Sequence, residues 1–135
     1  MSSPATVCLP IEDRRRSHRF YCHGLGLDAV GPLADDGLPE PLQHVVNNGL
    51  AVMLIPRGGF GWVVTGREVA AGPVECLLSL TLPSVHDVDA FAERAAGAGG
   101  RVVAAPQLQP WGEYSATVAD PDGHLWQLTT PVQGE

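Results

Sequence analysis

The sequence contains no lysine, and its 8 basic residues are all arginine. Without a lysine amine, Schiff-base catalysis and a phosphate-binding P-loop are excluded. The 15 acidic residues outnumber the basic ones and give a formal net charge of -7. A broad positive field, which nucleic-acid phosphates require, is therefore missing. We expect no nucleic-acid partner.

Cysteine is scarce, and Cys8, Cys22 and Cys76 are far apart, without a C-x-x-C pair. This spacing favours reduced thiols over a disulfide framework, a zinc ribbon or a redox motif. No apolar run approaches the roughly 18 residues of a membrane-spanning helix. The N-terminus also lacks the charged start and apolar stretch of a signal peptide. We therefore expect a cytoplasmic protein without a membrane partner.

Patterns of known catalytic sites are also lacking, including G-x-S-x-G and a Ser/His/Asp arrangement. The 5 histidines are scattered, and surface or turn positions are their default interpretation. His44 is an exception, because it falls on a predicted strand that could line a cavity and accept a proton. Glu75 and Glu113 lie next to predicted strand ends, where a general base and a solvated charge are both open interpretations. His44 and Glu113 are thus weak catalytic candidates.

The sequence does contain enough apolar residues, 44% of 135, to build the core of one domain. Residues 6–11 alternate between apolar and other side chains, which predicts a half-buried strand. Residues 17–25 follow as a helix, with Asp13 offering an N-cap and Phe20 facing inward. Strands are predicted over residues 42–46 and 50–55, joined by a tight turn at Asn48 and Gly49.

The same order of elements then restarts. A strand near residues 77–82, a helix over 87–96 and strands over 101–105, 114–118 and 125–129 are predicted. Local features repeat as well: Leu-Pro in the first strand, a glycine stop after the helix and a turn before the last strand. We therefore predict a single domain over residues 1–135, with one repeat unit at about 5–56 and another at about 74–131. The glycine-rich connection, about 57–73, contains an apolar stretch at 60–64 for which a lid, a linker and a short strand are all open.

Two segments carry a resemblance to a known family. The opening Leu-Pro-Ile-Glu-Asp, followed by Ser-x-x-Phe-Tyr and Leu-Gly, and the closing Ala-Asp-Pro-Asp-Gly-His-Leu-Trp-Gln-Leu resemble the vicinal oxygen chelate superfamily. This is also called the glyoxalase, bleomycin resistance and extradiol dioxygenase superfamily. The resemblance implies an α+β fold of the glyoxalase/bleomycin resistance/dihydroxybiphenyl dioxygenase type. Two tandem βαβββ units with mixed sheets would form a cleft, with helices on the outer face, commonly in a homodimer that completes the cavity.

The resemblance also implies where a divalent metal would bind in metal-dependent members. Their ligands are usually a His opening the first strand of a unit and a Glu in its last strand. The corresponding first-strand positions here are Thr6, and Leu77 or Ser79 depending on the alignment. The last-strand positions are Met53 and Gln127. Because none of these is a carboxylate or an imidazole, we expect no metal and no cofactor.

Side-chain alternation predicts which residues face the cleft. Val7, Leu9 and Trp126 belong to the helix-facing set. The opposite, cleft-facing set is mostly apolar with a few neutral hydrogen-bonding groups: Thr6, Cys8, Ala51, Met53, Ser79, Leu125, Gln127 and Thr129. This lining suits a neutral, apolar or aromatic small molecule better than a phosphate.

Aromatic residues add candidates for ligand contact. Trp62 and Trp111 lie in glycine-flanked segments, where each would either cap the cavity or cover the core edge. Tyr114 would either lend a hydroxyl to the cleft or pack as strand filler. The predicted ligand-binding set is therefore Thr6, Cys8, Met53, Trp62, Ser79, Trp111, Tyr114 and Gln127.

Three functions are consistent with these observations. The first is a metal-independent small-molecule binding protein of the bleomycin-resistance type, which needs no catalytic residue. The second is an enzyme of the same superfamily, a lyase, isomerase or dioxygenase, using His44 or Glu113 as base or a displaced metal site. The third is a structural or regulatory dimer without a functional cleft.

Overall fold

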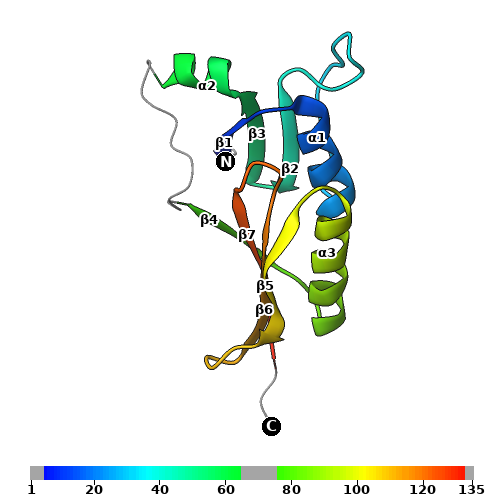
Figure 1. Cartoon of the computed structure of the whole chain (residues 1–135), viewed down its shortest axis with the longest axis vertical. Coiled ribbons are helices and arrows are strands. Elements are labelled where there is room, and N and C mark those ends of the chain that lie inside the picture. Colours follow the sequence, from blue (N-terminus) through cyan, green and yellow to red (C-terminus); the bar gives the residue numbers. More distant parts are fainter. Residues whose placement is uncertain (1–4, 65–75, 133–135) are drawn as a thin grey trace.

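Two β-sheets of unequal size form the framework of the chain (Figure 1). The computed structural model describes residues 5–64 and 76–132. The first sheet has the strand order β1-β3-β2, and the second β4-β7-β6-β5. Their strands are β1 Ala5–Ile11, β2 Leu42–Asn47, β3 Leu50–Pro56, β4 Leu77–Thr81, β5 Arg101–Leu108, β6 Glu113–Ala119 and β7 Leu125–Pro131.

The two sheets repeat one topology. The first strand of each unit pairs in parallel with the last, β1 with β3 and β4 with β7. The preceding strand completes an antiparallel pair, β2 with β3 and β6 with β7. This mixed pattern confirms the predicted α+β fold with two related units.

The units differ at one sheet edge. The outermost strand of the second sheet is β5, but the first sheet has only a single bridge there, between Ala29 and His44. Two hydrogen bonds flank this bridge, from Val30 N to Gln43 O at 3.2 Å and from Val45 N to Asp28 O at 2.9 Å. The first unit therefore keeps only a remnant of a fourth strand.

The main helices begin at side-chain caps. The Asp13 carboxylate accepts the backbone N–H of Arg16 at 2.9 Å and opens α1, Arg14–Arg19, which continues as a π-helical turn, η1, Phe20–Gly24. Ser84 caps α3, Val85–Gly97, by accepting the N–H of Asp87 at 3.2 Å. Both helices start earlier than predicted: α1 begins directly after its cap with polar residues that carry no apolar signal, and α3 is capped by Ser84 rather than opened by Asp87.

The apolar stretch at residues 60–64 is not a strand. Its residues 60–63 end a third helix, α2, Arg57–Val63, which directly follows β3. A lid or linker role for this segment stays a prediction. Three glycines within the seven residues of α2 hide the helical signal, because each is less favourable in a helix than alanine by about 1 kcal/mol. An ion pair between Arg57 and Glu12, 3.3 Å from Nε to Oε2, ties its first turn to the end of β1. The rest of the predicted connection, from residue 65, lies outside the described residues.

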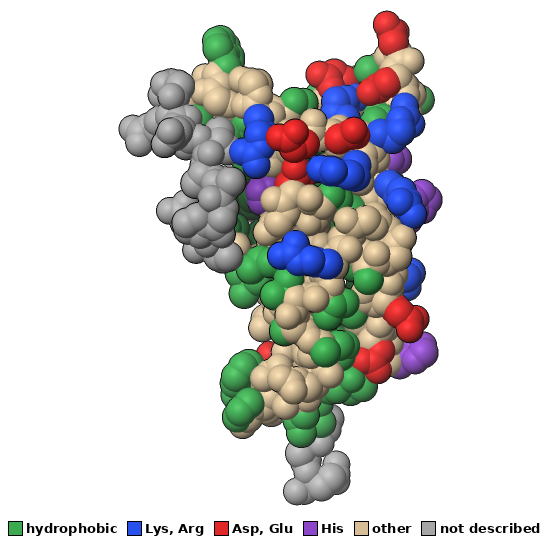
Figure 2. Space-filling view, viewed as in Figure 1, with side chains coloured by type: hydrophobic (Ala, Val, Ile, Leu, Met, Phe, Trp, Pro, Cys, Tyr) green, Lys and Arg blue, Asp and Glu red, His purple; other side chains and the backbone are tan. Residues whose placement is uncertain are grey.

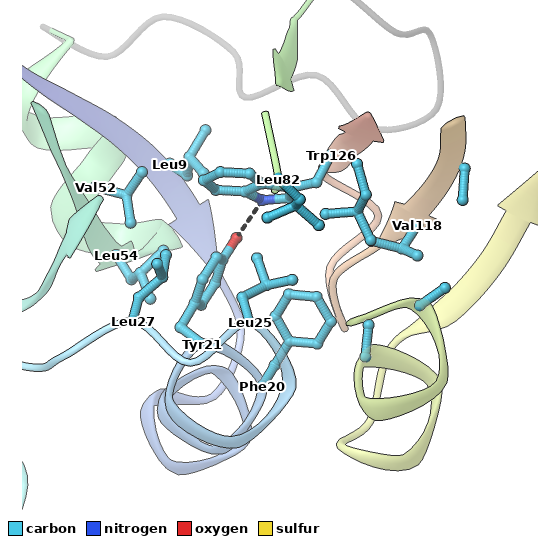
Figure 3. Packing of buried hydrophobic residues seen from close by; sticks show 14 of the residues in the cluster. Leu9, Phe20, Tyr21, Leu25, Leu27, Val52, Leu54, Leu82, Val118 and Trp126 are labelled. Atoms are coloured by element: carbon cyan, nitrogen blue, oxygen red, sulfur yellow. Dashed lines mark hydrogen bonds between the residues drawn. The ribbon is translucent and has the colours of Figure 1, made fainter. Parts of the chain in front are cut away.

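The core lies between the sheets and the two longer helices, α1 with η1 and α3, which run along the same side of both sheets (Figure 1). Phe20 and Tyr21 of η1 are fully buried among side chains from both units. Tyr21 points toward Trp126 of β7, whose indole N–H donates to the tyrosine oxygen at 3.2 Å (Figure 3). The inward position predicted for Phe20 and the core position predicted for Trp126 are confirmed. None of the helices in residues 5–64 and 76–132 is long and apolar enough to span a membrane.

Candidate functional site

The side of each sheet that faces away from α1 and α3 is called the open face. In the first sheet, Leu9 of β1 and Val52 of β3 are buried toward the helices. Their neighbours Cys8 and Met53 point the opposite way, and Cys8 is exposed while Met53 is half-buried. Cys8 and Met53 are register partners in the parallel β1–β3 pair, so their sulfur-containing side chains lie next to each other. The open face of this sheet is apolar and uncharged at its centre.

The open face of the second sheet is richer in hydrogen-bonding groups. Ser79 of β4 and Gln127 of β7 are register partners. The Ser79 hydroxyl donates to Oε1 of Gln127 at 3.0 Å. Two residues along β7, the Thr129 hydroxyl donates to Oε1 of Glu113 at 2.9 Å. These two bonds fix the Gln127 amide and the Glu113 carboxylate on the face opposite the helices.

Two more polar residues of β6 share this face and were not among the predicted site residues. Ser115 pairs with Thr129, and Thr117 pairs with Gln127. Both have the same strand parity as Glu113, so alternation along β6 was the signal that could have found them. The open face of the second sheet is therefore more polar than the predicted lining.

Five predicted ligand-binding residues, Thr6, Cys8, Met53, Ser79 and Gln127, lie on the open faces, as their parity requires. Each sheet brings its own members together, Cys8 with Met53 and Ser79 with Gln127. The register pairs none of the first-sheet residues with the second-sheet residues. The candidate site therefore consists of two halves, one on each sheet.

His44 is not on the open face, contrary to the position proposed for a catalytic base. It is the register partner of Val52, and its ring is fully buried on the helix side. Its Nδ1 lies 3.1 Å from the carbonyl oxygen of Leu27, and the Tyr21 ring centroid is 5.5 Å away. Burial lowers the pKa of His44, which keeps the imidazole neutral. The strand was predicted correctly. A register irregularity between Val45 and Asn47, however, shifts β2 by one residue against β3 and places the His44 side chain in the core.

Tyr114 also lies on the helix side, so its interpretation as strand filler is the one that holds. It pairs with Thr130 between Glu113 and Ser115, and its side chain packs against the core. Its hydroxyl donates to Asp89 of α3 at 2.7 Å. The prediction that the Tyr114 hydroxyl reaches a ligand in the cleft is therefore wrong.

The two candidate tryptophans outside the strands are both uncovered. Trp62 of α2 is 82% exposed, and Trp111, in the connection from β5 to β6, is 65% exposed. Neither covers the core edge, which was one of the two predicted roles. Ligand contact by either residue stays a prediction. Glu75 lies outside the described residues.

The metal-ligand positions can be compared through the register. Met53 and Gln127 occupy equivalent positions, and their partners are Cys8 and Ser79. Thr6 is therefore equivalent to Leu77, each lying two residues before those partners. The donor set offers hydroxyls, a thioether and an amide whose oxygen already accepts a hydrogen bond from Ser79. Such donors do not fit a divalent cation, which needs carboxylates or imidazoles to offset its charge.

Elsewhere in the part of the chain that is described, no group of three or more His, Cys, Asp or Glu side chains is arranged to hold a metal ion. Some of the charged side chains instead pair with each other. Arg14 contacts Asp36 at 3.2 Å and Glu40 at 2.6 Å. Figure 2 shows charges of both signs mixed over the upper half of the molecule, and hydrophobic side chains gathered at its lower end, near the β5–β6 connection.

The comparisons with known proteins agree with this architecture. Residues 4–128 match the Glyoxalase/Bleomycin resistance protein/Dioxygenase superfamily. The chain belongs to this superfamily. It is 40% identical over 130 residues to an uncharacterized protein of Mycobacterium bovis, covering 93% of this chain and 81% of that one.

Solved structures with the same fold include a glyoxalase-related enzyme from Fulvimarina pelagi. It has a TM-score of 0.81 and 28% identity, covering 96% of this chain and 88% of that one. The hypothetical protein SA1046 from S. aureus also has a TM-score of 0.81, with 25% identity and coverages of 96% and 94%. The expected family and fold are confirmed.

Proposed function

We propose that the chain is a metal-independent protein that binds a small, largely apolar or aromatic molecule between open faces of its sheets. The observation that supports this most is the composition of those faces. Cys8, Met53, Ser79 and Gln127 are uncharged, and none of them is among the fully buried residues. A sheet surface lined by such uncharged side chains favours an apolar ligand that makes a few hydrogen bonds.

The same arrangement supports a homodimer. The two longer helices lie on the same side of both sheets (Figure 1), so both open faces turn the other way. Among the described elements, no helix is in extensive contact with strands of both sheets. A second copy that places its second sheet opposite the first sheet would enclose a ligand on both sides. We propose this homodimer in the cytoplasm, without a nucleic-acid or membrane partner.

An enzyme of the same superfamily is the alternative function. The relative from Fulvimarina pelagi is described as a glyoxalase-related enzyme, which favours this alternative. Of the two candidate bases, only Glu113 has the parity of the open face, because His44 faces the core. A lyase or isomerase of this kind would therefore depend on Glu113 for proton transfer.

Binding is tested by titrating the purified protein with 1-naphthalenemethanol and measuring heat or intrinsic tryptophan fluorescence. We expect saturable binding that weakens several-fold in Met53→Asp, because this change places a charge on an apolar face. Glu93→Gln, on the exposed side of α3, is the matched control and should bind as the parent does. Absence of saturable binding to this probe and to a library of aromatic compounds would contradict the proposal.

A further inference from the structure

The open face of the second sheet carries one carboxylate, Glu113, among neutral polar side chains. Glu113 is half-buried at the start of β6. The residues that follow it on the same face, Ser115 and Thr117, carry hydroxyls, and their β7 partners Thr129 and Gln127 are also uncharged. A carboxylate in this setting dominates the electrostatic potential near it.

The Glu113 carboxylate is held in a defined position. Its Oε1 accepts the Thr129 hydroxyl at 2.9 Å. Thr129 is only 4% exposed, so that hydroxyl is itself fixed by its surroundings. Binding of a ligand to this carboxylate therefore costs less side-chain entropy than binding to a glutamate that is free to rotate, because Glu113 is already ordered.

The charge of Glu113 is not offset by an ion pair within the described residues. The arginines that form ion pairs there are Arg14, Arg16 and Arg57, and their acidic partners are Asp36, Glu40, Asp122 and Glu12. A half-buried carboxylate without a cation is stabilised when a cationic or N–H group approaches it. None of the ion-paired arginines provides such a group to Glu113, so a ligand could provide it.

We infer that Glu113 selects the ligand of the proposed function: a molecule with an apolar or aromatic body that carries an amine, whose N–H groups donate to the Glu113 carboxylate. The amine lies at the β6 end of the second sheet, and the apolar body extends over the Cys8 and Met53 surface contributed by a first sheet. Glu113 acts here as a specificity-determining residue. The inference rests on the proposed function, because it requires a ligand at the open faces.

The experiment compares three probes with the same ring system and different charge, 1-naphthylmethylamine, 1-naphthalenemethanol and 1-naphthoate, by titration calorimetry near neutral pH. We expect the amine to bind about tenfold more tightly than the alcohol, and the carboxylate to bind most weakly. In Glu113→Gln, which keeps an acceptor for Thr129, the amine should bind no better than the alcohol, whose affinity should change less than about threefold. Glu93→Gln should keep the preference of the parent.

The outcomes separate the two proposals. If the alcohol binds but the amine binds no better than the alcohol, the role of Glu113 is overturned and the binding function stands. If the preference for the amine persists in Glu113→Gln, another group provides it, and the assignment to Glu113 is wrong. If none of the three probes binds, the proposed function fails for aromatic ligands, and the inference fails with it.

Discussion

The hydroxyl of Tyr21 donates a hydrogen bond of 2.7 Å to Oδ2 of Asp120 in the fully buried core. The bond joins the two repeat units, because Tyr21 belongs to η1 and Asp120 precedes β7. Oδ1 of Asp120 accepts the backbone N–H groups of Asp122 and His124, at 2.9 and 2.8 Å. Burial raises the pKa of Asp120, and burial together with the Asp120 charge raises the pKa of Tyr21 well above its usual value. The Asp-Pro-Asp-Gly turn that begins at Asp120, part of the closing segment that resembles the family, thus also connects one unit to the other.

Replacing Tyr21 by Phe should destabilise the chain by about 1–3 kcal/mol, because it leaves a buried carboxylate oxygen without a donor. The change is measured by denaturant unfolding. Tyr114→Phe is the control, since its hydroxyl bonds Asp89 at the surface, and it should cost less than about 1 kcal/mol. Equal effects of the two substitutions would show that the Tyr21 bond does not connect the units energetically.

Gly100→Ala should destabilise the contact between the units. A Cβ at this position would overlap the carbonyl oxygen of Ala119 and the ring of Phe20. Because neither the strand backbone nor the buried ring can move freely, we expect a loss of about 1–3 kcal/mol in the free energy of unfolding. Gly97→Ala, whose Cβ would meet nothing within 4 Å, is the matched control at the end of α3. A stable Gly100→Ala variant would mean that η1 and β6 are packed less closely.

Stability should decrease as the pH falls below about 6.5, because burial lowers the pKa of His44 in the folded state below its usual value of 6.5. In this window the unfolded chain binds a proton that folded His44 does not, so protonation favours unfolding. Unfolding free energies measured from about pH 8 to about pH 5 should show this loss. His44→Asn, which keeps a donor for the Leu27 carbonyl, should reduce the slope.

His18 contributes to the same dependence. Its pKa is lowered, first by burial and then by His23 and nearby arginines, and its ring centroid is 5.5 Å from that of His44. His86→Asn, on the exposed surface of α3, serves as the reference substitution for the pH series. If His44→Asn and His86→Asn retained identical pH slopes, the acid sensitivity would not come from the buried imidazole.

Protein purified without chelators should contain far less than one divalent ion per chain, because Thr6, Met53 and Gln127 provide no anionic ligand. Elemental analysis checks this. A stoichiometry near one that disappears in Gln127→Ala would contradict it. Thr6→His combined with Gln127→Glu should introduce metal affinity; a double variant without affinity would show that these residues do not converge in the assembled protein.

Much of the fold could be predicted from the sequence because the relevant signals are local. Alternation in residues 6–11 and 125–129 located β1 and β7, and the Asp13 cap located α1. The helix α2 was missed because its glycines suppress the intrinsic helical propensity, and its position depends on contacts with β1 and β3. The reduced outer strand at residues 28–30 was missed because a single bridge has no sequence pattern.

The candidate site was predictable only in part. Parity correctly separated Met53 and Gln127 from Val52 and Trp126, because both last strands are regular. The side of His44 could not be predicted, because a register irregularity between Val45 and Asn47 shifts β2 by one residue against β3 and pairs His44 with Val52 instead of Met53. In the proposed homodimer the two halves of the site come from different chains, and no local sequence pattern encodes such a contact.

The central claim, that a small molecule binds at the open faces, is tested most directly by protection of Cys8 from alkylation. Cys8 is exposed on the open face beside Met53, and Cys76 is an exposed internal reference just before β4. Burial raises the pKa of Cys22, so this third thiol should react slowly. With saturating 1-naphthalenemethanol, the account predicts slower iodoacetamide labelling of Cys8 and unchanged labelling of Cys76, measured by mass spectrometry of peptides. Saturable binding that leaves the Cys8 rate unchanged would contradict it.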